Sequence, residues 1–257
     1  MKSSLYSPEL MRPYIGCAGW SIPKAFSAGF PREGSHLERY ALVFNAVEIN
    51  SSFYRPHKPG IYERWKNMVP DTFRFAVKMP KTITHSLKLK NSEDELVSFL
   101  NQCSGLGAKL GVLLVQLPPS LAYEKETVDA FFTMLRTHFE GDVALEPRHV
   151  TWFAPDVDRF LSGCRVARVA ADPGLIKEAS IPGGWNDLVY YRLHGSPRMY
   201  YSGYSSDYLG KLAHQIREGV VRGSRVWCIF DNTAEGAATG NALAVTEMLN
   251  YQNEDSY

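Results

Sequence analysis

The chain has 257 residues, with 28 Lys and Arg against 27 Asp and Glu, a formal net charge of +1, and 45% hydrophobic residues. This balance excludes a global electrostatic attraction to nucleic acid or to an anionic membrane, and leaves only a local basic site open. The hydrophobic content excludes disorder over most of the length. No apolar stretch reaches the roughly 20 residues that span a bilayer.

Eight short apolar runs predict strands, near residues 14–18, 46–51, 73–79, 110–117, 143–147, 165–171, 188–194 and 225–231. Helical spacing or helix-start signals follow most of them, over 35–43, 60–68, 92–104, 125–139, 156–162, 206–221 and 234–249. The segment 172–187 is rich in Pro and Gly and predicts a loop with at most a short helix. Strands that alternate with helices predict a parallel sheet covered by helices.

Two architectures fit eight such strands, a closed barrel and an open doubly wound sheet. The sequence contains neither GxGxxG nor GxxxxGK[ST], and its length is typical of a barrel. We therefore predict a TIM-like (β/α)8 barrel with an irregular segment in place of a regular helix after strand six. One domain covers 1–257, with an N-terminal extension over 1–13 and a C-terminal tail over 250–257.

The four cysteines are far apart in the sequence and form no CxxC pair, so buried reduced thiols are the preferred interpretation. Residues 1–13 lack the apolar core of a signal peptide. These two observations predict a cytoplasmic protein.

Several strands carry a charge on the face opposite their bulky apolar residues. Val47 and Ile49 share one face of strand two, so Glu48 takes the other. Lys78, Glu146 and Arg192 are placed in the same way on strands three, five and seven. In a barrel, that other face is the interior, where a charge is costly unless it is paired or used.

Polar residues also gather where the predicted strands end, which is where barrels place catalytic residues. We assign the catalytic roles to Glu48, Lys78, Glu146 and His194. The candidate substrate-binding residues are Trp20, Asn50, Tyr54, His85, Gln116, Arg148, His149, Asp172, Arg192, Tyr204, Asp231 and Asn232.

Glu48 and Glu146, with His194, have the chemistry of general acids and bases. The alternative is a buried ion-pair network with arginine or lysine that fixes the barrel geometry. Four charges on different strands are more than a packed barrel core needs, which favours function.

Lys78 has two interpretations. A desolvated barrel lysine forms Schiff bases with carbonyl compounds. A glutamate on the neighbouring strand two would raise the pKa of Lys78 instead, which favours a cation that binds anions.

Histidines follow or end three strands, and with Glu146 and Asp172 they offer an alternative as ligands of a divalent metal. No HxH or HExxH spacing supports it, so we predict no metal and no other cofactor. Arg148 and Arg192 are suited to phosphate or carboxylate. Tyrosines crowd the loop after strand seven, at Tyr200, Tyr201, Tyr204 and Tyr208, and suit either stacking on a ligand or packing of the loop.

Eight motifs in this order resemble domain-of-unknown-function family 72, the YecE-like family. They are GCAGWS (16–21), VEINSSFYR (47–55), FAVK (75–78), TH (84–85), QLPPS (116–120), ALEPRHVTW (144–152), YRLHG (191–195) and FDNTAEGAATGNA (230–242). The resemblance implies a TIM-like barrel and no established reaction. The chain departs from the family pattern at Cys17-Ala18, where Thr-Ser is usual, at Pro147, and at Asp231, where an asparagine is usual.

We expect an enzyme that binds a phosphorylated or otherwise anionic small molecule, and that hydrolyses a phosphoester or isomerises its substrate. The alternative is a nucleic-acid-binding protein that holds single strands or the phosphate backbone with its arginines and tyrosines. No membrane partner is expected, and the sequence does not determine the oligomeric state.

Overall fold

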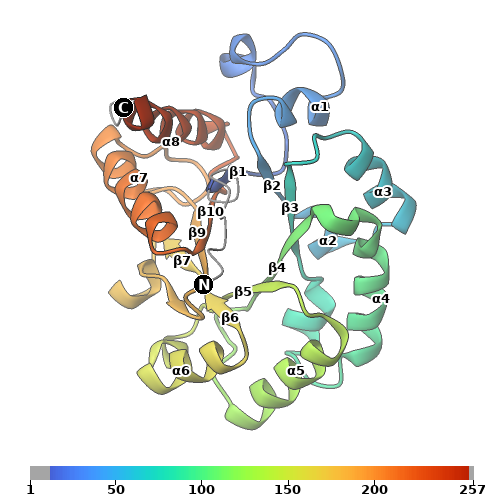
Figure 1. The fold of residues 1–257 in the computed structure, drawn as a ribbon. Helices are drawn as coiled ribbons and strands as arrows, with labels where there is room; N and C mark the ends of the chain where they lie inside the picture. Colours follow the sequence, from blue (N-terminus) through green and yellow to red (C-terminus); the bar gives the residue numbers. More distant parts are fainter. Residues whose placement is uncertain (1–11, 255–257) are drawn as a thin grey trace, which may run out of the picture.

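One sheet of ten strands dominates residues 12–254, the part of the chain that the computed structural model describes. The strands are β1 (Tyr14–Ala18), β2 (Ala46–Ile49), β3 (Arg74–Lys78), β4 (Leu110–Gln116), β5 (Asp142–Glu146), β6 (Val166–Arg168), β7 (Ala170–Asp172), β8 (Gly183–Gly184), β9 (Leu188–Leu193) and β10 (Arg225–Phe230). Neighbouring strands pair in parallel, except that β8 is antiparallel to β6. Figure 1 shows them around a common centre with the helices outside.

The ring is completed by the predicted sixth strand, which is divided in two. Its first half, β6, pairs with β5, and its second half, β7, pairs with β9. The Val169 N–H between the halves still donates to Leu145 O at 2.9 Å. The strand order β7-β9-β10-β1-β2-β3-β4-β5-β6-β8 therefore makes a nearly closed barrel, which confirms the predicted fold class.

Each strand serves two cores, as its alternating residues predict. Val47, Ile49, Phe75 and Val77 lie in the core between the sheet and the helices. The opposite face forms a separate core inside the barrel, in which four of the eleven buried residues are alanines. These small side chains leave space for the large ones, and Tyr190 stacks on Trp227 there with ring centroids 6.0 Å apart.

The helices are α1 (His36–Ala41), α2 (Ser51–Tyr54), α3 (Pro59–Asn67), α4 (Glu93–Cys103), α5 (Lys125–His138), α6 (Pro155–Gly163), α7 (Ser206–Val221) and α8 (Ala237–Glu254). α7 and α8 lie on one side of the barrel and α3 and α4 on the opposite side (Figure 1). The segment after β7 contains only a 3-10 turn at Lys177–Ser180 and the short β8, as the sequence predicts.

The structure describes most of the predicted C-terminal tail but little of the predicted N-terminal extension. α8 continues to Glu254, five residues beyond the predicted helix and into the predicted tail. Residues 1–11 of the predicted extension lie outside the described residues. Among residues 12–254, no helix combines the length and the apolar character needed to cross a bilayer.

Candidate functional site

Arg192 on β9 lies at the centre of a charge network inside the barrel. Its side chain is 1% exposed. Nε and Nη2 donate to Glu48 of β2, with Nη2 at 2.7 Å from Oε1, while Nη1 donates to Glu146 Oε2 of β5 at 3.1 Å. Nη2 also lies 3.0 Å from Asp231 Oδ2. Arg192 therefore joins carboxylates from three different strand ends.

Glu48 is fully buried, and its carboxylate accepts hydrogen bonds from two side chains. Besides Arg192, the hydroxyl of Tyr190 donates to Glu48 Oε2 at 2.8 Å. The sequence analysis missed Tyr190, although it stands two residues before Arg192 and therefore on the same face of β9. Every oxygen of Glu48 already has a donor, so the carboxylate has little capacity left for another ligand.

Glu146 at the end of β5 is surrounded in the same way. Gln116 Nε2 donates to both carboxylate oxygens at 3.0 Å, and Arg148 Nε and His194 Nε2 each lie 3.1 Å from Oε1. Burial alone would raise the pKa of Glu146, but Arg192, His194 and Arg148 outweigh it and hold the pKa well below its ordinary value. Glu146 is therefore ionised at neutral pH.

His194 lies between two carboxylates. Its Nε2 contacts Glu146 and its Nδ1 lies 3.0 Å from Asp231 Oδ2. Burial favours the neutral ring, but the two carboxylates outweigh burial and raise the pKa of His194. Burial likewise opposes the charge on Asp231, whose pKa is nevertheless lowered by Arg192 and His194. The charge on Asp231, at the position that departs from the family pattern, is thus neutralised inside the protein.

The charges of the network balance. The carboxylates of Glu48, Glu146 and Asp231 form ion pairs with the cations Arg192, His194 and Arg148, three against three. Lys78 is a fourth cation and has no ion-pair partner among the side chains that the structure describes. The set of seven side chains therefore carries an excess charge of +1 when His194 is protonated.

Lys78 ends β3 and is only 7% exposed. Its Nζ lies 4.1 Å from the centre of the Phe53 ring, and no carboxylate of residues 12–250 comes within 4.0 Å of it. Burial, and then the charge of Arg192, lower its pKa to about 8, against the opposing effect of Glu48 and the other carboxylates. The predicted increase in the pKa of Lys78 is wrong, because burial outweighs the attraction of Glu48.

Two further predicted residues, His85 and Asn50, lie beside this network. His85 packs edge-on against Phe53, with ring centroids 5.0 Å apart, and its pKa is lowered by burial and then by Lys78, Lys81 and Arg148. The amide of Asn50 approaches Asp231 Oδ1 at 3.5 Å. Tyr200 contributes from the loop after β9, where its ring lies 5.7 Å from that of His194. Together they form the upper rim of the network.

Asp172, Asn232 and Tyr204 take another position. Asp172 is in register with Leu193, which belongs to the outer core, so its side chain faces the helices and not the barrel interior. The Tyr204 hydroxyl donates to Asp172 O at 3.0 Å, and Asn232 Nδ2 donates to Ser202 O at 2.8 Å and to Asn241 Oδ1 at 2.9 Å. These three residues hold the loop after β9 in place.

Trp20, His149 and Tyr54 lie away from the network contacts. Trp20 packs edge-to-face on Trp65 of α3, with ring centroids 5.1 Å apart. His149 accepts a hydrogen bond from the Thr151 backbone N–H and so caps the turn at 150–153. Tyr54 is 78% exposed at the end of α2. Their proximity in sequence to strand ends did not place them in the network.

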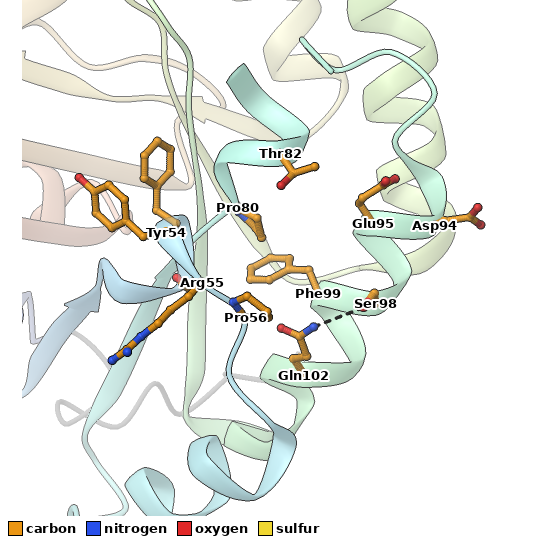
Figure 2. Close-up of a pocket in the computed structure, with 12 residues that line it drawn as sticks. Tyr54, Arg55, Pro56, Pro80, Thr82, Asp94, Glu95, Ser98, Phe99 and Gln102 are labelled. Atoms are coloured by element: carbon orange, nitrogen blue, oxygen red, sulfur yellow. Dashed lines mark hydrogen bonds between the residues drawn. The ribbon is translucent and has the colours of Figure 1, made fainter. Parts of the chain in front are cut away.

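Tyr54 belongs to a separate groove of about 330 Å³ beside the mouth. Figure 2 shows Tyr54 and Arg55 on one wall and Glu95, Ser98 and Phe99 of α4 on the other, with Pro56 and Pro80 between them. Phe53 lines the groove and also contacts Lys78. The groove and the charge network therefore share one aromatic wall.

The described residues provide no metal centre. Within 12–254, no group of three or more His, Cys, Asp and Glu is arranged to hold a metal ion. Both ring nitrogens of His194 already contact carboxylates. The arrangement instead suits an anion, because cations lie at the rim and the carboxylates beside them are already paired with Arg192 and His194.

Replacing Arg192 tests the network. We expect Arg192→Met to lower the free energy of unfolding by about 3–5 kcal/mol, because it leaves Glu48 buried without its main counter-ion. Urea denaturation measures this loss. The exposed Arg159→Met is the control, with an expected change within about 0.5 kcal/mol. Equal effects of both variants would contradict a central role for Arg192.

The raised pKa of His194 predicts a pH dependence. The stability that protonated His194 contributes is fully present below about pH 6.5, the pKa of unfolded histidine, and is lost as the pH rises toward the higher folded value. Between pH 6 and 7.5 the free energy of unfolding should therefore fall, and His194→Gln should remove that fall. His214→Gln, whose side chain is 70% exposed, should keep it. Parallel curves for wild type and His194→Gln would show that His194 is not charged.

The sequence has curated relatives over much of its length. The UPF0759 protein YecE of Escherichia coli (strain K12) is 36% identical over 142 residues, which cover 55% of this chain and 50% of YecE. The UPF0759 protein YunF of Bacillus subtilis (strain 168) is 24% identical over 270 residues, which cover 93% of this chain and 95% of YunF. The match thus spans about half the length of YecE and nearly all of YunF.

Solved structures show the same fold. A DUF72 family protein from Enterococcus faecalis V583 superimposes with a TM-score of 0.78 at 22% identity, over 93% of this chain and 96% of that one. A DUF72 family protein from Thermotoga maritima MSB8 gives 0.77 at 26% identity, over 92% and 98%. The family model described as "Protein of unknown function DUF72" matches residues 14–256. These matches confirm the resemblance seen in the motifs, and the chain belongs to the DUF72 family.

Proposed function

We propose that this protein is an enzyme that binds an anionic small molecule, phosphorylated or carboxylated, in the mouth of the barrel and transfers a proton on it. One observation carries the proposal: Lys78 is a buried cation without an ion-pair partner among residues 12–250, beside a network whose other charges balance. A buried, uncompensated charge is costly, and a bound anion would offset that cost.

Arg148 supplies the second cation of this site. Two of its nitrogens contact Glu146, which orients the guanidinium, while its side chain stays 27% exposed. The charges of both Lys78 and Arg148 lower the pKa of His85, which supports placing the anion near all three groups. A planar guanidinium beside an ammonium suits a carboxylate or a phosphate.

Lys78 is also the group best suited to move a proton. A pKa of about 8 lets it exchange a proton near neutral pH. Glu48 and Glu146, which the sequence analysis assigned as acid and base, accept hydrogen bonds on all their oxygens. We therefore give both carboxylates the role of holding Arg192 and His194, and favour isomerisation, which needs proton transfer at carbon, over hydrolysis, which needs a base for water.

Ligand-induced stabilisation tests the anion site. We expect at least one of inorganic phosphate, ribose 5-phosphate and pyruvate to raise the Tm, by about 5–10 °C at a concentration a hundred times the Kd. Arg148→Met should abolish the shift, and the exposed Arg64→Met of α3 should keep it. No shift with any probe, or a full shift in Arg148→Met, would contradict the proposal.

Binding of single-stranded nucleic acid remains the second candidate. It is favoured by the loop after β9, where the Arg198 guanidinium lies 3.7 Å from the centre of the Tyr201 ring, which is 36% exposed. Such a pair suits stacking on bases. If it binds, fluorescence anisotropy with a labelled oligothymidine at low salt should give a Kd that increases about tenfold in Tyr201→Ala. Wild-type protein that fails to bind at low salt would end this proposal.

A further inference from the structure

The amine of Lys78 has the surroundings of a nucleophile as well as those of a cation. Its Nζ lies over the Phe53 ring, and no acceptor among residues 12–250 forms a hydrogen bond or ion pair with it. Its backbone is fixed, because Lys78 O accepts the hydroxyl of Ser52 at 2.6 Å and the residue lies in register with Leu114. The amine therefore has a defined position and a free lone pair once it loses its proton.

The neighbours of Lys78 favour that loss. Desolvation and an adjacent cation are the two environments that activate lysines in proteins. Lys78 has both, since it is 7% exposed and lies in the field of Arg192. The carboxylates that would oppose deprotonation are committed to Arg192, His194 and Arg148.

We propose that Lys78 forms a Schiff base with the carbonyl group of an anionic aldehyde or ketone whose carboxylate or phosphate is held by Arg148. This inference rests on the proposed function, because it takes the anion site as given. It adds the class of substrate, a carbonyl compound, and a covalent role for one residue.

Formation of the imine releases one water molecule and needs no other reactant. The neutral amine attacks the carbonyl carbon, the C–N bond forms, and the C=O π pair moves to oxygen, which takes up a proton. The carbinolamine then loses its hydroxyl as water, and a C=N bond forms, so that amine and carbonyl give imine and one water. The imine, once protonated, withdraws electrons from the adjacent carbon and makes its C–H bond acidic, which serves an isomerisation.

His85 is placed to carry the protons of these steps. Its Nδ1 lies 2.9 Å from Thr84 Oγ1, and the Thr84 hydroxyl donates to Pro80 O at 3.3 Å. Thr84 therefore accepts from Nδ1–H, which leaves the lone pair of the neutral ring on Nε2. Nε2 has no partner among the described residues, and His85 packs on the same Phe53 ring as Lys78.

Trapping by reduction tests the proposal. Full-length protein is incubated at pH 7.5 with pyruvate or with dihydroxyacetone phosphate in the presence of cyanoborohydride, and the modified lysines are mapped by mass spectrometry. A lysine whose pKa is about 8 holds roughly two hundredfold more neutral amine at this pH than an ordinary one. We expect Lys78 to be modified at least about tenfold faster than the exposed Lys81, three residues away.

The controls separate the two proposals. Acetone, which lacks the anion, should label Lys78 more slowly than pyruvate does, and Arg148→Met should lower the labelling rate with pyruvate or dihydroxyacetone phosphate toward the rate seen with acetone. The probe that labels best distinguishes carboxylate from phosphate. Lys78→Arg, checked for an unchanged Tm, should show no adduct at residue 78.

Equal labelling of Lys78 and Lys81 in the wild-type protein would overturn the Schiff base. If Tm shifts with anions still depended on Arg148, the anion site would stand and only the covalent step would fail. Loss of both results would end the proposed function as well.

Discussion

The charge network inside this barrel depends on one buried guanidinium, that of Arg192. Arg192 extends from β9 and donates hydrogen bonds to Glu48 of β2 and to Glu146 of β5, which are both buried. Removing a charge from water costs several kcal/mol even after relaxation, so Glu48, whose cationic partner among the described residues is Arg192, depends on this ion pair inside the barrel. Arg192 in turn needs the space left by alanines such as Ala76 and Ala144, which line the interior where barrels usually carry branched side chains. The barrel interior thus combines small alanine side chains with the long side chain of Arg192, which is paired with both glutamates.

This arrangement determines where reactivity remains. Glu48, Glu146 and Asp231 accept contacts from Tyr190, Gln116 and the three cations, which makes them fixed charges more than bases. His194 is fixed for the same reason, since both its nitrogens face carboxylates. Lys78 and His85 lie at the rim, both in contact with Phe53, and neither has a carboxylate within 4.0 Å in the described part of the chain. The pairing inside the barrel therefore leaves the rim with one cation that has no carboxylate partner among the described residues, Lys78, and one base, His85.

Much of this was accessible from the sequence, because strand alternation is a local property. The eight strands, the inward direction of Glu48, Lys78, Glu146 and Arg192, and the irregular segment after strand six were all predicted. Asp172 and Asn232 were assigned by their place at a strand end, whereas their parity with Ala170 and Phe230, both in the outer core, turns them toward the helices. The direction of the pKa of Lys78 was predicted wrongly, because it depends first on how deeply the amine is buried and then on the charge of Arg192, and both appear only in three dimensions. Trp20 packs on Trp65 and not on the charge network, and this contact cannot be read from the spacing of the sequence.

The central claim is that Lys78 is a desolvated amine without an ion-pair partner among residues 12–250, beside a network whose charges balance. Its own titration tests this most directly, by following the 13Cε chemical shift of Lys78 in protein labelled with 13C-lysine, with the resonance assigned by its loss in Lys78→Arg. The structure predicts an inflection at a pH of about 8. An inflection near the ordinary lysine value of about 10.4 would show that Lys78 is hydrated or paired, and would contradict the account.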